Sequence, residues 1–110
     1  MSIFDQRGQT VTYQYNFGAV GDVAGLLAEL KKLQAGLYQA VEQNAVTGEP
    51  AVEARYSLDK AILEAEKPAP DKKKVGDYLA SARTAIEGVA AASGLVIALT
   101  KAAELVGTLF

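Results

Sequence analysis

The sequence GVAAASGLVIAL, residues 88–99, is the most apolar stretch of the chain, and it joins two helical patterns of different register. In each pattern, apolar residues recur every three or four positions and form one seam along a helix, but the two seams do not continue one another. The first is Val75, Leu79, Ala82, Ile86 and Val89, and the second is Leu95, Leu99, Ala102, Val106 and Leu109. Because the small pair Ser93-Gly94 stands where the register changes, we predict a kink or a break near Gly94.

The length of this helical region makes that break decisive for the fold. A straight helix from residue 72 to residue 110 would be about 58 Å long at 1.5 Å per residue, against about 33 Å for the helix that begins at Asp22. A compact monomer cannot cover the longer one. Either the helix bends back on itself, or partner chains cover it.

Two further helices are expected upstream, each with its own cap and seam. Asp22 is a good N-cap for the first helix, which should end near residues 44–48. The second helix carries Pro50 in its first turn, with Thr47 or Glu49 near the cap, and runs to Lys67. The apolar seam of the helix that begins at Asp22 is Val23, Leu26, Leu30, Leu33, Leu37 and Ala40, widened by Leu27, Tyr38 and Val41. For the second helix we predict an inner face of Val52, Tyr56, Ile62, Leu63 and Ala65.

A short linker separates the second and third helices. Pro68 and Pro70 end the second helix, because proline disfavours helical backbone in the residue before it. Asp71 then caps the third helix. The basic run of residues 72–74 falls in its first turn, and we interpret it as a solvated helix start.

The N-terminal segment follows a different period. Residues 10–17 alternate between polar and apolar side chains, which is typical of a β-strand. A lone strand leaves backbone N–H and C=O groups without partners, and amide side chains can form ladders between identical strands. We therefore predict an arm that pairs with other chains, although it could instead lie across its own bundle. Its assembly residues are Val11, Tyr13, Tyr15 and Phe17 on one face, with Gln14 and Asn16 on the other.

Composition excludes catalysis that depends on histidine or cysteine. The chain has neither Cys nor His, so thiolate metal sites, disulfides and histidine-based catalysis are absent. Gly18, Gly21 and Gly25 superficially suggest a phosphate-binding loop, but the preceding strand alternates and no second strand follows the helix. The carboxylate pairs Glu49/Glu53 and Glu64/Glu66 are interpreted as solvated helix surface. We expect no catalytic residue, no metal and no cofactor.

The net charge and the hydropathy of the chain limit the classes of partner that are expected. The net charge of −2 does not favour nucleic acid, and the start of the chain does not have the pattern of a signal peptide, so a cytoplasmic location is expected. The thirteen uncharged residues from Gly88 to Thr100 fall short of the roughly twenty that span a bilayer. Three interpretations of the segment stay open: a buried bundle helix, a protein interface and a membrane-entering segment. Its candidate residues are Gly88, Gly94, Leu95, Ile97 and Leu99.

A resemblance to other proteins rests on two stretches of the chain, FDQRGQTVTYQYN (4–16) and IEGVAAASGLVIALTKAAELVGTLF (86–110). Together they resemble uncharacterised bacterial modules in which a short Gln/Asn/Gly-rich β tag precedes a small helical domain, sometimes beside signalling or defence-type domains. The resemblance implies a bacterial origin and a role in self-association or adaptor contacts. It transfers no catalytic residue.

The sequence therefore predicts a mainly α fold with two parts. Residues 1–21 form a β arm and glycine joint, and residues 22–110 form an antiparallel bundle of three long helices, the third kinked or split near Gly94. The expected function is a non-enzymatic oligomerisation, scaffold or adaptor module, a homo-oligomer with a possible protein partner. The alternative is a small membrane-active effector that uses residues 88–99.

Overall fold

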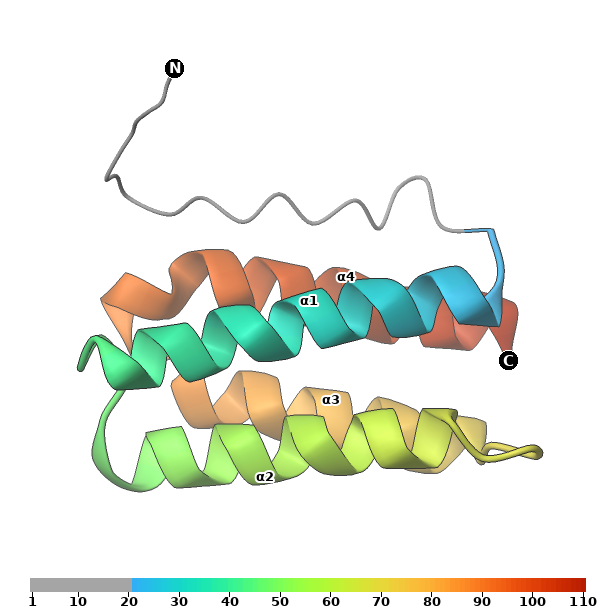
Figure 1. Cartoon of the computed structure of the whole chain (residues 1–110), viewed down its shortest axis with the longest axis horizontal. Helices are drawn as coiled ribbons and strands as arrows, with labels where there is room; N and C mark the ends of the chain where they lie inside the picture. Colours follow the sequence, from blue (N-terminus) through green and yellow to red (C-terminus); the bar gives the residue numbers. More distant parts are fainter. Residues whose placement is uncertain (1–20) are drawn as a thin grey trace, which may run out of the picture.

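The computed structural model describes residues 21–110, which form an antiparallel bundle of four helices (Figure 1). They are α1 (Val23–Glu42), α2 (Gly48–Ala65), α3 (Lys72–Ile86) and α4 (Ser93–Leu109), with the short 3-10 turn η2 (Ala90–Ala92) before α4. Each helix runs antiparallel to its neighbour in the chain, and α1 also lies beside α4 (Figure 1). The prediction of a mainly α bundle is confirmed, whereas the predicted β arm lies outside the described residues.

The third predicted helix is two helices, α3 and α4, and the chain reverses between them. The reversal lies at residues 87–92, several positions before the predicted break at Gly94. Val89 is extended there (φ −97°, ψ 109°), and its N–H donates to the carbonyl oxygen of Ile86 at 2.9 Å. The chain therefore bends back, which is one of the two solutions that its length allowed.

The position of the break follows from where the apolar seam of α3 ends. Gly88 lies two residues after the end of α3 and is a poor helix former, so the helix ends at its last fully buried residue, Ile86. Gly94 lies in the first turn of α4, outside the left-handed region, and a Cβ there would meet nothing within 4 Å. Its backbone is ordinary helix.

The core is made from the leucine-rich face of α1, the buried face of α2 with Leu58, and the seams of α3 and α4. On α1, α3 and α4 the innermost apolar side chains are at most 2% exposed: Leu26, Leu30, Leu33, Leu37, Val75, Leu79, Ala82, Ile86, Leu99, Ala102 and Val106. These positions confirm the central residues of the predicted seams of α1, α3 and α4. The ends of those seams, Val23, Ala40, Val89, Leu95 and Leu109, are half-buried, and Tyr38, which was expected to widen the α1 seam, is exposed.

The predicted inner face of α2 is wrong at three of its five positions. Val52, Tyr56 and Leu63 are 66%, 61% and 58% exposed and point away from the bundle. The buried face is instead Ala51, Ala54, Leu58, Ala61, Ile62 and Ala65. The contact between α2 and α3 is the most extensive of any helix pair, and small side chains allow two helices to approach closely. Close packing therefore buries four alanines together with Leu58 and Ile62, and leaves Val52, Tyr56 and Leu63 outside.

The N-caps predicted for α1, α2 and α3 make the expected side-chain hydrogen bonds at two of these three helix starts. The Asp22 carboxylate accepts from the Gly25 N–H at 2.7 Å, and the Asp71 carboxylate accepts from the backbone N–H groups of Lys73 and Lys74. Thr47 occupies the N-cap of α2, but its side chain makes no capping hydrogen bond. Gly48 follows it in the left-handed region at φ 69°, where a β-carbon is strained.

We expect Leu30→Ala, Leu37→Ala and Ile86→Ala each to lower the free energy of unfolding by about 2–5 kcal/mol, because each leaves a cavity in the core. Leu63→Ala is the matched control. Its side chain is 58% exposed, so it should cost less than about 0.5 kcal/mol in dilute solution. Urea unfolding followed by circular dichroism measures all four. Core variants that were no less stable than the control would contradict this assignment of the core.

Candidate functional site

The sequence-predicted site residues do not gather on one described surface. The assembly residues 11–17 lie outside the described residues. In the second group, Leu99 is 1% exposed and faces the core, while Ile97 is 59% exposed and points away from it. Gly88 and Gly94 are exposed and Leu95 is half-buried. Residues 88–99 are therefore divided between the bundle interior and the solvent.

Three of the five large apolar residues that are exposed on the described surface lie on α2. Val52, Tyr56 and Leu63, here called the α2 stripe, fall within about 40° of one another around a helix that turns 100° per residue. Sequence reasoning assigned these residues to the core and so missed them as a surface. The signal that could have found them is the competing alanine-rich seam of α2, which runs along the opposite side of the helix.

A hydrogen-bonded cluster borders the stripe on the side of α1. The Asp59 carboxylate accepts from Gln34 Nε2 at 2.7 Å and from the Tyr38 hydroxyl at 2.6 Å. The Arg55 guanidinium lies 4.5 Å from the centre of the Tyr38 ring. The hydrogen bond to Asp59 raises the pKa of Tyr38, because loss of the proton would place a second negative charge there. This cluster fastens α1 to α2.

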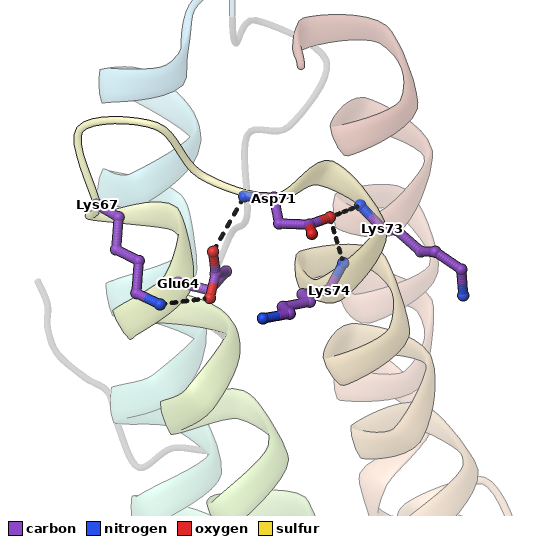
Figure 2. Close-up of polar contacts among 5 residues, drawn as sticks. All are labelled: Glu64, Lys67, Asp71, Lys73 and Lys74. Carbon is purple, nitrogen blue, oxygen red and sulfur yellow. Dashed lines mark hydrogen bonds and ion pairs between the residues drawn. The ribbon is translucent and has the colours of Figure 1, made fainter.

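A second cluster closes the linker between α2 and α3 (Figure 2). Glu64 is 7% exposed, and its carboxylate accepts from the Asp71 N–H at 3.0 Å and from Lys67 Nζ at 2.9 Å. The expectation of a solvated Glu64 is therefore wrong, because the linker folds back over its carboxylate. Figure 2 shows Asp71 turning its own carboxylate to the start of α3.

The chemistry of this second cluster is that of a structural ion pair. The Asp71 N–H, followed by Lys67, lowers the pKa of Glu64, since both donors favour the ionised carboxylate. The same contact raises the pKa of Lys67. A carboxylate held ionised by two donors is a poor general acid, which needs a raised pKa.

The hollows of the described surface do not assemble a reactive group. One lies between α1 and α2, at Tyr38, Glu42 and Arg55, and another between the start of α3 and the end of α4, at Lys73 and Gly107. In the second hollow, Lys73 pairs with Asp77 at 3.2 Å. Within residues 21–110, no three carboxylates lie close enough to hold a metal ion.

We expect Glu64→Gln to destabilise the protein at pH 7 and to do so less at low pH. The folded-state pKa of Glu64 lies below its ordinary value of 4.5, so the stability that its charge contributes is fully present above that pH. It is lost as the pH falls through the lower, folded-state pKa. Urea midpoints at pH 7 and at about pH 3 measure the change.

Glu66→Gln is the control for this prediction. Glu66 pairs with Lys31 at 2.9 Å, but both side chains are well exposed, and exposed pairs contribute little to stability. Equal losses for the two variants, or a Glu64→Gln loss that did not change with pH, would contradict the role given to the Glu64 cluster.

Comparison with known proteins gives no relative from which a function could be carried over: no protein family, no curated protein and no solved structure matches the chain.

Proposed function

We propose that the protein is a non-enzymatic oligomerisation module, acting as a scaffold or adaptor. The observation that carries the proposal is the α2 stripe. The bundle has a complete core without it, and yet three large apolar side chains stay 58–66% exposed on one helix face. Exposed apolar side chains that cluster on one face favour an interaction surface.

The N-terminal arm supports the same function from the sequence side. Its alternating residues, from Val11 to Phe17, offer an apolar face and a polar face with strand-favouring side chains. A strand of this kind gains backbone hydrogen bonds when it pairs with the edge of another strand. Identical arms supply such edges to one another. We propose that arm pairing and helix contacts act together in the assembled protein.

The rest of the proposal follows from this mechanism. The partner is a further copy of the chain, with a second protein as a possible addition. The bacterial origin and the place beside signalling or defence domains rest on the sequence resemblance alone. The two polar clusters at Asp59 and Glu64 are given structural roles, because each carboxylate already accepts two hydrogen bonds.

We expect Tyr13→Pro to lower the mass of the assembly in solution while the helix content stays unchanged. Proline removes one backbone N–H and fixes φ, so it interrupts strand pairing without touching the helices. Size exclusion coupled to light scattering gives the mass, and circular dichroism gives the helix content. Gln6→Pro, placed before the alternating residues, is the matched control. If Tyr13→Pro and deletion of residues 1–19 both keep the parent mass, the arm is not an assembly element.

A membrane-active effector is the second candidate, and one observation favours it. Residues Ala90–Leu109 form a helical stretch of 20 residues that is long and apolar enough to cross a bilayer, and only 33% of its most apolar part is buried in the bundle. The stretch includes Lys101 and Glu104, and its Leu99 and Val106 belong to the core. Membrane entry would therefore require the bundle to open.

Dye leakage from anionic phospholipid vesicles separates the two functions. Under the leading proposal, we expect no leakage above that of a buffer blank, because opening the bundle would expose the core residues of α1 and α3. Leakage that is lost on Ile97→Glu and kept on Val52→Glu would support the effector and overturn the scaffold. Ile97 and Val52 are similarly exposed, so the pair controls for added charge.

A further inference from the structure

We propose that α2 pairs with α2 of a second copy, antiparallel, across a two-fold axis that passes between residues 57 and 58. This inference rests on the proposed function, and it names the surface and the geometry of one contact within the assembly. The pattern of apolar and charged residues on the outer side of α2 matches its own reverse to within two positions.

The α2 stripe sets the register. In an antiparallel pair centred between residues 57 and 58, Val52 of one copy faces Leu63 of the other, because both lie 5.5 positions from the axis. Tyr56 lies 1.5 positions from it, about 2 Å along the helix, so the two Tyr56 rings meet at the centre. The three most exposed apolar residues of α2 thereby cover one another.

The charges on the far flank of the stripe from α1 fit the same register. Glu49 and Glu53 occupy the first half of α2 on this flank, and Lys60 and Lys67 follow in the second half and just beyond the helix. A two-fold axis places each flank against itself in the reverse direction. Lys60 of the second copy therefore lies two positions, about 3 Å along the helix, from the point opposite Glu53, and Lys67 of the second copy lies one position from the point opposite Glu49. Side chains of this length span both offsets.

The contacts that these charged residues make within the bundle leave them able to pair with a second copy. Glu53 and Lys60 make no ion pair with another residue of the described part of the chain, 21–110. Lys67 binds Glu64, but its side chain is 58% exposed. On the flank beside α1, Asp59 of the second copy lies one position from the point opposite Arg55. Each of these three charged pairs joins opposite charges.

The parallel arrangement does not share this property. In a parallel pair related by a two-fold axis along the helices, residues on the contact line face their own copy, whereas each flank faces the opposite flank. Asp59 lies about 20° from Val52 around the helix, so the two Asp59 carboxylates would approach one another near that line. Like charges in close approach disfavour the parallel pair, so the charge pattern favours the antiparallel arrangement.

The size of the contact sets its strength. The helix is about 27 Å long, and three apolar side chains from each copy bury less than the roughly 800 Å² per partner of a standard stable interface. We therefore expect a weak, concentration-dependent pair. Contacts between the N-terminal arms would strengthen it by raising the effective concentration.

Disulfide trapping tests the geometry directly, because the full chain has no native cysteine. In a mixture of Val52→Cys and Leu63→Cys chains, we expect a disulfide-linked heterodimer under mild oxidation. Neither variant should link to itself, since the two copies of residue 52 lie about 16 Å apart along the axis, beyond the roughly 7 Å reach of a disulfide. A mixture of Val52→Cys with Glu104→Cys, on the exposed side of α4, is the control and should not link.

Charge reversal tests the facing pairs without a covalent bond. Glu53→Lys and Lys60→Glu should each weaken dimerisation of the full chain by about three- to tenfold, because each places like charges opposite one another at two symmetric points. An equimolar mixture of the two variants should recover the parent affinity, since each facing pair of the mixed dimer again joins a lysine to a glutamate. Glu104→Lys makes the same change of charge on α4 and should leave the affinity unchanged. Analytical ultracentrifugation gives the dissociation constants.

Three outcomes would overturn the pairing. If the chain assembles but the 52–63 link does not form in the mixture, the contact is elsewhere and the proposed function stands. If Val52→Cys links instead to a cysteine introduced at Tyr13 in the same chain, the arm covers the stripe. If the full chain is a monomer at every concentration, the proposed function fails together with the pairing.

Discussion

The reversal of the chain at residues 87–92 is the constraint on which the rest of the structure depends. It turns one helical region too long for a small protein into α3 and α4, which run antiparallel (Figure 1). Leu99 and Val106 of α4 then reach the same core as the leucines of α1. Without this reversal, the apolar face of α1 would lose its contacts with α4, and burial of such faces is the main stabilising contribution in a bundle.

The opposite end of the bundle is held by polar contacts. The proline-containing linker between α2 and α3 folds back so that the Asp71 N–H reaches the Glu64 carboxylate, while Lys67 neutralises it (Figure 2). Asp71 then caps α3 with its own side chain. This arrangement fixes where α3 starts relative to the end of α2. The alanines of α2 are thereby set against α3, where close packing buries them.

The same packing gives α2 its functional potential. Because α2 presents its small residues to α3, its larger apolar residues Val52, Tyr56 and Leu63 remain on the surface. They lie between two flanks of charge. On the side of α1, Asp59 is tied to Gln34 and Tyr38, and on the other side Glu53 and Lys60 are open to a partner. The surface proposed for association is thus a consequence of how the core is filled.

The sequence by itself determined the helices, most of their caps and three of the four buried faces. Asp22 and Asp71 could be read as N-caps because the hydrogen bonds of a cap are local, and the seams of α1, α3 and α4 followed from apolar residues at helical spacing. Only the tertiary structure decided which face of α2 is inside, where the long helical region reverses, and that Glu64 is buried. Each of these depends on contacts between segments distant in the chain. On α2 two seams satisfied the same period, one of large residues and one of alanines, and the close approach of α3 selected the small ones.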